Sequence, residues 1–220
     1  MNSKLMDTII TFVVILAVVG LIYYVWKMYS ARKKSNEPTQ PAPGNQELTL
    51  ENVGQGGMIR LMNVGKNMEE YDVRILSKSI YREGENTEWY ELEGDNGERK
   101  IWISLEYDDD LDVTIATRKL KLRDLPISRS DLDDMDEQGE GEFAFEGKTY
   151  YYENSTEGSY FRNGDVSPEN EEFFYYWEFE TNDEEEFLTI EEWENGTIEV
   201  TISYPVKASQ VKVYSLGENL

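Results

Sequence analysis

The sequence predicts a mostly β protein, in which two duplicated antiparallel meander units form a barrel or a sandwich after one N-terminal transmembrane helix. Three observations support this fold class. An uncharged apolar run lies close to the first residue. In the rest of the chain, apolar and polar residues alternate, as they do along strands with one buried face. A segment of this second part also recurs later at a constant offset.

The uncharged run has 18 residues, begins at Ile9 and ends at Trp26. A helix rises about 1.5 Å per residue, so the run is just long enough for a hydrocarbon core of about 30 Å. Tyr23 and Tyr24 lie near its end, where aromatic rings favour the headgroup layer. A cleaved signal peptide is the alternative, but it has a shorter apolar region and a small-residue cleavage site. We therefore expect residues 1–34 to be a membrane anchor with a basic collar, which binds the lipid bilayer.

The flanking charges predict how the anchor is oriented. Four basic residues follow the apolar run between positions 27 and 34, whereas Lys4 alone precedes it. Because cytoplasmic flanks carry the excess of Lys and Arg, we expect a single-pass cell-membrane protein with its C-terminal domain in the cytoplasm. Residues 35–46 contain three prolines and no aliphatic run, which is typical of an extended linker.

Composition excludes several classes of chemistry. The 220 residues include 45 Asp or Glu, 21 Lys or Arg, no His and no Cys, for a net charge of −24. The chain therefore has no Cys or His nucleophile, no Ser-His-Asp triad, no thiolate or imidazole zinc site and no disulfide. Since its acidic surface repels phosphate, we expect no nucleic-acid partner, and no motif indicates a cofactor. Residues 45–220 hold 16 of the basic and 43 of the acidic residues, a net charge of −27.

Alternating residues indicate the strands of this acidic part. Ile101, Ile103 and Leu105 share one side of an expected strand. Turn signals such as Asn195-Gly196 separate the strands, because both central residues of a tight hairpin turn take positive φ. Further sets on one side of a strand are Leu111, Val113 and Ile115; Tyr175, Trp177 and Phe179; Leu188 and Ile190; Ile198, Val200 and Ile202; and Val211 and Val213.

An internal repeat defines the expected units. Residues 89–115 align without gaps to residues 176–202 at an offset of 87, with seven identities in 27 positions. Two acidic three-strand meanders would share some of this pattern by chance, but coinciding turns and strands favour duplication. We expect a first β unit over residues 47–125 and a second over residues 143–216, joined by an acidic connector over residues 126–142.

The second unit also carries a set of aromatic motifs. They are Gly-Lys-Thr-Tyr at 147–150, Tyr-Trp-Glu-Phe-Glu at 176–180, Leu-Thr-Ile-Glu-Glu-Trp at 188–193 and Pro-Val at 205–206. With these motifs, residues 50–214 resemble the bacterial domain of unknown function 4178 family. The resemblance implies an uncharacterised β domain without assigned catalytic residues. Its genes often lie beside those of polyamine aminopropyltransferases or small membrane proteins, which is an association and not an activity.

Two clusters of acidic residues are candidate metal sites. Asp108, Asp109, Asp110 and Asp112 fit a solvated turn better than a calcium loop, which needs converging ligands at defined spacing. In the connector, a partial EF-hand match fails because Phe145 stands where the bidentate Glu is required. We therefore expect no metal site, and a charged connector that starts with one helical turn capped by Ser130.

Carboxylate pairs, including Glu178/Glu180 and Glu191/Glu192, are too frequent in this sequence to mark an active site. A glycosidase needs two carboxylates held across a sugar, one of them with a raised pKa. We therefore expect no enzyme, and a carboxylate-based hydrolase is the remaining enzymatic alternative.

The aromatic residues embedded in acidic sequence are the candidate ligand or partner surface. Alternation predicts that Trp177 and Phe179 face one side of a strand, and that Tyr176 and Glu178 face the other. Aromatic faces beside carboxylates suit a cation, although large aromatics also fill cores. The candidate residues are Trp89, Trp102, Tyr176, Trp177, Glu178 and Trp193.

The functional hypothesis is a non-enzymatic, membrane-anchored cytoplasmic β domain that recruits or senses a partner, in particular a basic protein, through this surface. The alternative is a binding domain for a cationic small molecule such as a polyamine.

Overall fold

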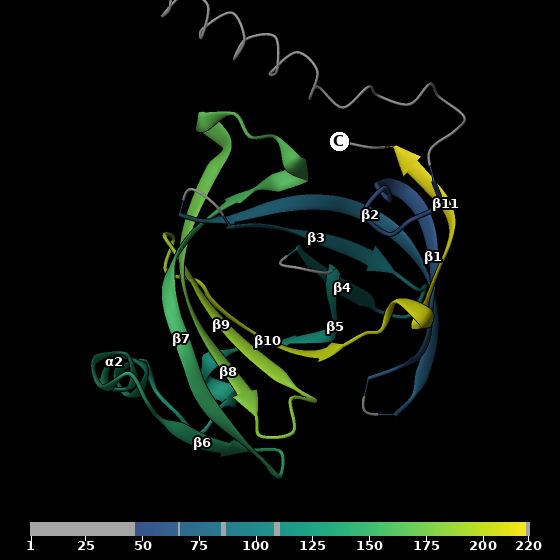
Figure 1. Ribbon diagram of the computed structural model, residues 1–220. Helices are drawn as coiled ribbons and strands as arrows, with labels where there is room; N and C mark the ends of the chain where they lie inside the picture. Colours follow the sequence, from purple (N-terminus) through teal and green to yellow (C-terminus); the bar gives the residue numbers. More distant parts are fainter. Residues whose placement is uncertain (1–46, 66, 85–86, 108–110, 219–220) are drawn as a thin grey trace, which may run out of the picture. The chain divides into compact units, whose positions relative to one another are not determined.

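The computed structural model describes residues 47–65, 67–84, 87–107 and 111–218 (Figure 1). The predicted membrane run from Ile9 to Trp26 and the linker at 35–46 lie outside these ranges. Within them, no helix has both the length and the apolar character needed to cross a bilayer.

The described part is mostly β, as predicted. The strands are β1 (Gln55–Val64), β2 (Glu69–Glu83), β3 (Thr87–Asp95), β4 (Lys100–Tyr107), β5 (Leu111–Leu120), β6 (Glu142–Phe145), β7 (Lys148–Phe161), β8 (Glu171–Thr181), β9 (Phe187–Trp193), β10 (Ile198–Pro205) and β11 (Val211–Glu218). The α-helix is α2 (Arg129–Gln138), and short 3-10 turns are η1 (Leu122–Asp124), η2 (Arg162–Gly164), η3 (Pro168–Asn170) and η4 (Ala208–Gln210).

The strands form one antiparallel sheet in the order β11-β1-β2-β3-β4-β5-β10-β9-β8-β7-β6. Strand β2 has 15 residues, and one of its edges pairs with two different strands. Its first half pairs with β1, from Glu69 to Arg74, whereas Ile80, Tyr81 and Arg82 pair with β7. This second pairing partly closes the sheet into a ring that runs from β2 to β7 (Figure 1). The predicted barrel or sandwich is therefore one continuous sheet with a ring at its centre.

The apolar sides of the strands form two large cores and a smaller aromatic cluster of Tyr81, Phe174 and Tyr176. The first contains Leu92 of β3, Ile103 of β4 and Ile115 of β5, which pack with residues of β1. The second contains Trp177 of β8 and Ile190 of β9. The predicted faces are thus confirmed, because Ile101, Ile103, Leu105, Val113, Ile115, Phe179, Leu188, Val200 and Ile202 are all buried.

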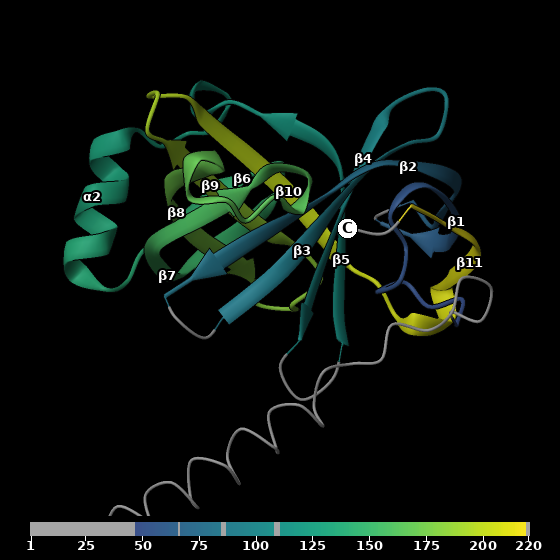
Figure 2. The same cartoon turned by 90° about the horizontal axis from the view of Figure 1, so that it is seen from above.

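The acidic connector differs from its prediction. It contains a ten-residue helix, α2, rather than one turn, and Ser128 rather than Ser130 caps it. Ser128 and Asp131 form a capping box in which the Asp131 carboxylate accepts a hydrogen bond from the Ser128 backbone N–H at 2.7 Å. The side chain of Leu132 is 0% exposed and packs into the second core, which holds the helix. In Figure 2, α2 and the pair β1 and β11 lie at opposite ends of the described part.

The strand boundaries coincide with the internal repeat. Strands β4 and β9 begin at Lys100 and Phe187, and β5 and β10 begin at Leu111 and Ile198, so each pair is 87 residues apart. In the ring, β5 and β10 are hydrogen-bonded neighbours, and β4 and β9 flank them on either side. A duplication would explain this arrangement, and it stays a prediction.

Candidate functional site

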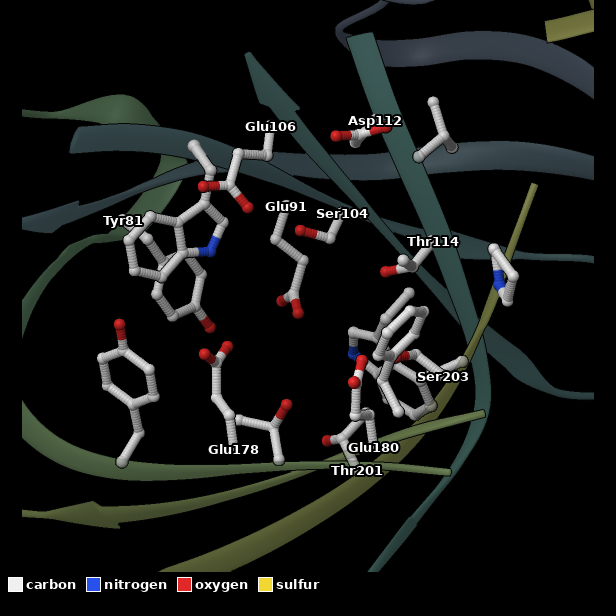
Figure 3. Close-up of a pocket in the computed structure, with 18 of the residues that line it drawn as sticks. Tyr81, Glu91, Ser104, Glu106, Asp112, Thr114, Glu178, Glu180, Thr201 and Ser203 are labelled. Carbon is white, nitrogen blue, oxygen red and sulfur yellow. The ribbon is translucent and has the colours of Figure 1, made fainter. Parts of the chain in front are cut away.

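A cavity of about 920 Å³ lies inside the ring (Figure 3). All the ring strands from β2 to β7 contribute side chains to its wall. Strand alternation explains which side chains line the cavity. In β3, Trp89 and Glu91 point into it, while Tyr90 and Leu92 pack on the first core. Small-molecule sites usually have volumes of about 300–1,000 Å³, and this cavity falls in that range.

The lining is acidic and aromatic. Among the described residues that line the cavity, one is basic, Lys207, and eight are carboxylates. The carboxylates are Glu83, Glu91, Glu106, Asp112, Glu153, Glu178, Glu180 and Glu191. The aromatic side chains in the wall are Tyr81, Trp89, Trp102, Phe174, Tyr176, Phe179 and Phe187. Hydroxyl groups of Ser104, Thr114, Thr189, Thr201 and Ser203 complete the polar lining.

Two repeat-related carboxylates face each other across this space. Figure 3 shows the side chain of Glu91 entering from the β3 wall and that of Glu178 entering from the β8 wall. These positions are 87 residues apart and are identical in the two copies of the repeat. Trp89 and Tyr176, which precede them by two residues, are also 87 apart and line the same cavity.

A second pair of carboxylates, Glu91 and Glu191, lies near the ammonium group of Lys119. Lys119 Nζ donates a hydrogen bond to Glu199 Oε2 at 2.7 Å and lies 5.2 Å from the centroid of the Trp102 ring. Burial by itself lowers the pKa of Lys119, but the charges of Glu91, Glu199 and Glu191 raise it overall. Burial raises the pKa of Glu91, and burial together with the charge of Glu91 raises the pKa of Glu191 to about 8.

Glu178 lies in a different acidic environment. Burial and the charges of Glu106, Glu83 and Glu153 raise its pKa, although Asn154 Nδ2 donates a hydrogen bond to its Oε2 at 2.8 Å. Burial and neighbouring carboxylates also raise the pKa of Glu180. The cavity therefore disfavours additional negative charge along much of its wall.

Stacked aromatic rings form one side of the site. The centroids of Tyr81 and Trp89 are 5.3 Å apart in a stacked arrangement, and Trp89 meets the edge of Tyr176 at 6.2 Å. The Tyr176 hydroxyl donates a hydrogen bond to Glu83 Oε2 at 2.6 Å. This bond and the ring contacts hold the aromatic faces in fixed orientations beside carboxylates.

The structure brings together four of the six predicted site residues. Trp89, Trp102, Tyr176 and Glu178 line the cavity. Trp193 packs instead against Phe174 and Tyr160, with ring centroids at 5.1 Å and 5.4 Å.

Trp177 lies on the other face of β8, as its alternation predicted. It is 0% exposed within the second core, where the guanidinium of Arg129 lies 4.4 Å from its ring centroid. Trp177 therefore has a packing role.

Sequence reasoning missed Glu91, Glu191 and Lys119 as site residues. The repeat alone could have indicated Glu91, since it is the counterpart of Glu178. Of the acidic run at the β4–β5 turn, Asp112 lines the cavity and residues 108–110 lie outside the described ranges. Throughout the described ranges, no three acidic side chains converge as a metal ion would require.

A family model of a domain of unknown function, DUF4178, matches residues 65–208. The chain belongs to this family. The matched residues include every strand of the ring, from β2, the first in the chain, to β10, the last, so the cavity lies within the DUF4178 domain. No curated protein and no solved structure matches the chain.

Proposed function

We propose that this DUF4178 domain is a non-enzymatic binding domain whose cavity takes a small organic cation, with linear polyamines as the ligand class. One observation carries the proposal: eight carboxylates and several aromatic faces line one cavity of about 920 Å³. In the predicted full-length protein, an N-terminal anchor would tether this domain at a membrane.

Electrostatics favours a cation over a neutral or anionic ligand. Two unit charges 4 Å apart interact by about 4 kcal/mol at an effective dielectric constant of 20, so carboxylates that lie close together in the partly buried wall repel each other. Burial is the main cause of the raised pKa values of Glu91, Glu178 and Glu191, and neighbouring carboxylates raise them further. A cation relieves the repulsion, whereas a neutral ligand would leave it in place.

An organic cation fits the wall better than a metal ion. The carboxylates are spread around the cavity and do not converge, and aromatic rings alternate with them. Lys119 shows how an ammonium group can be bound by a carboxylate and an aromatic face together, since it contacts the Glu199 carboxylate and the Trp102 ring. A polyamine repeats the same chemistry, with ammonium groups joined by alkyl chains that pack against aromatic surfaces.

Recruitment of a basic protein, the hypothesis favoured by the sequence, requires its anionic aromatic residues on an outer surface. Trp89, Trp102, Tyr176 and Glu178 instead face the cavity, where a small molecule has better access than a folded partner. This placement favours the small cation as the first proposal.

A carboxylate-based hydrolase is a second candidate, supported by the raised pKa of Glu191 beside Glu91. Glycosidases use such a pair, one carboxyl as an acid and the other as a base or nucleophile. A neutral sugar, however, would leave six further lining carboxylates without a counter-charge. Turnover of nitrophenyl glycosides by the purified protein would support the hydrolase over the binding domain.

The test is isothermal titration of the full-length protein, in a mild detergent, with spermidine. A salt concentration of about 150 mM screens unspecific attraction to the acidic surface. We expect saturable binding at one site, and a loss of at least about tenfold in affinity for Glu178→Gln, because the variant removes a partly buried carboxylate that would pair with the cation. The control is Glu157→Gln, an exposed residue of β7 that does not line the cavity. Equal effects of the two variants, or no saturable heat, would contradict the proposal.

A further inference from the structure

The carboxylates of Glu91 and Glu191 lie in the same part of the cavity, on strands that face each other across the ring. Glu91 stands opposite Ser79 of β2 and Ser104 of β4. Glu191 stands opposite Tyr176 of β8 and Glu199 of β10. Both side chains line the cavity, and in the described part of the chain neither carboxylate accepts a hydrogen bond from a protein donor.

The protein does not supply enough positive charge for this pair. The nearby cation is Lys119 of β5, and its ammonium group already donates a hydrogen bond to Glu199. Two carboxylates that lie close together in a partly desolvated site avoid full ionisation by keeping a proton. The charged and titratable groups around the pair are Lys119, Glu199, Glu93, Glu178, Tyr81, Tyr160 and Tyr176.

An ammonium group can replace that proton. Resting on the function proposed above, we propose that one ammonium of the bound polyamine takes the place of the proton held by Glu91 and Glu191, so that binding releases a proton. In this exchange the carboxyl group of Glu191 loses its proton to solvent, and the resulting carboxylate pairs with the incoming ammonium. No electron is transferred. Exchange of one proton for one ammonium leaves the charge beside Glu91 and Glu191 unchanged, and the other ammonium groups of the polyamine add positive charge to the cavity.

The pKa of Glu191, raised by burial and by Glu91, determines how large the effect is. A carboxyl with a pKa of about 8 is about 90% protonated at pH 7, so binding should release about 0.9 proton per ligand. At pH 9 the same group is about 10% protonated, and the release should fall to about 0.1 proton.

Titration of the full-length protein with spermidine in phosphate and in Tris measures this release. The released proton is taken up by the buffer, and the two buffers differ in their heat of protonation. At pH 7, the binding heats observed in the two buffers should therefore differ by about 0.9 times the difference between those heats of protonation. Decamethonium, an alkane with a quaternary ammonium at each end, provides a probe whose own charge is independent of pH. Its dissociation constant should fall about tenfold between pH 7 and pH 9.

Two variants test which carboxyl group releases the proton. In Glu191→Gln the buffer dependence and the pH dependence should disappear, and in Glu91→Gln both should shrink, since the neighbouring charge is gone. The exposed control Glu157→Gln should retain both. Saturable binding with equal heats in the two buffers would overturn the proton exchange and leave cation binding intact. No saturable binding of either probe to the wild-type protein would overturn cation binding, and the exchange with it.

Discussion

Replacing Glu191 by Gln should change how the stability of the fold depends on pH. The pKa of this carboxyl is about 8 in the folded protein and 4.5 for an unperturbed Glu. Between these values the folded state binds more protons than the unfolded state, so the free energy of unfolding falls as pH rises from about 4.5 to about 8. Each unit of pKa shift corresponds to about 1.4 kcal/mol, which gives an upper value of about 5 kcal/mol for the full shift.

Water in the cavity and coupling to Glu91 reduce that value. We expect Glu191→Gln to match the wild type within about 1 kcal/mol at pH 5.5 and to exceed it by about 2–4 kcal/mol at pH 9. Urea unfolding followed by tryptophan fluorescence measures the difference at each pH, and Glu157→Gln is the matched control that should follow the wild type. The reasoning would be refuted by a difference that does not grow with pH, or by a variant that is less stable than the wild type at pH 9.

Three further substitutions test the packing around the ring. Lys119→Ala should lower the free energy of unfolding by about 1 kcal/mol, because it removes the partner of Glu199 from an ion pair whose side chains are 26% and 37% exposed. Added n-butylammonium should raise the thermal midpoint of this variant more than that of the wild type. Rescue by an uncharged alcohol of similar shape would contradict that explanation. Leu132→Ala should cost about 2–4 kcal/mol in urea unfolding by opening the contact under α2, and an unchanged midpoint would show that the helix does not stabilise the core. Gly94→Ala should cost about 1–3 kcal/mol in the same assay, because a Cβ there would lie 2.3 Å from Val73 Cγ1, and a neutral result would contradict the close packing.

The sequence predicted the strands well because their signal is local. In β8, the order Tyr176, Trp177, Glu178, Phe179 places alternate residues on opposite faces, and the structure puts Trp177 in a core and Glu178 in the cavity. Ring closure had no such signal, since it depends on a few pairs between β2 and β7, such as Ile80 with Phe161. Pairings between residues so far apart in the chain are set by the whole fold and not by a local pattern.

The site was predictable in its chemistry but not in its position. Composition showed aromatic residues among carboxylates, and four of the named candidates do line the cavity. In the sequence, Lys119 lies between Arg118 and Leu120, in a segment typical of a solvated strand end. Its proximity to Glu91 and Glu191 follows only from the three-dimensional arrangement. Trp193 satisfies the same composition rule and belongs to the same aromatic cluster as Trp89 and Tyr176, but it does not line the cavity, because it lies at the end of β9.

The net charge of −24 has two components with different physical consequences. Exposed acids such as Glu185 and Asp133, with side chains 73% and 59% exposed, are solvated and add solubility, as an adaptation to salt would also require. The carboxylates of Glu91, Glu178 and Glu191 have raised pKa values, so keeping them ionised lowers the stability of the fold. Adaptation to salt gives no reason to place acids inside the ring at that cost. A bound cation gives one, because it converts the same repulsion into binding free energy.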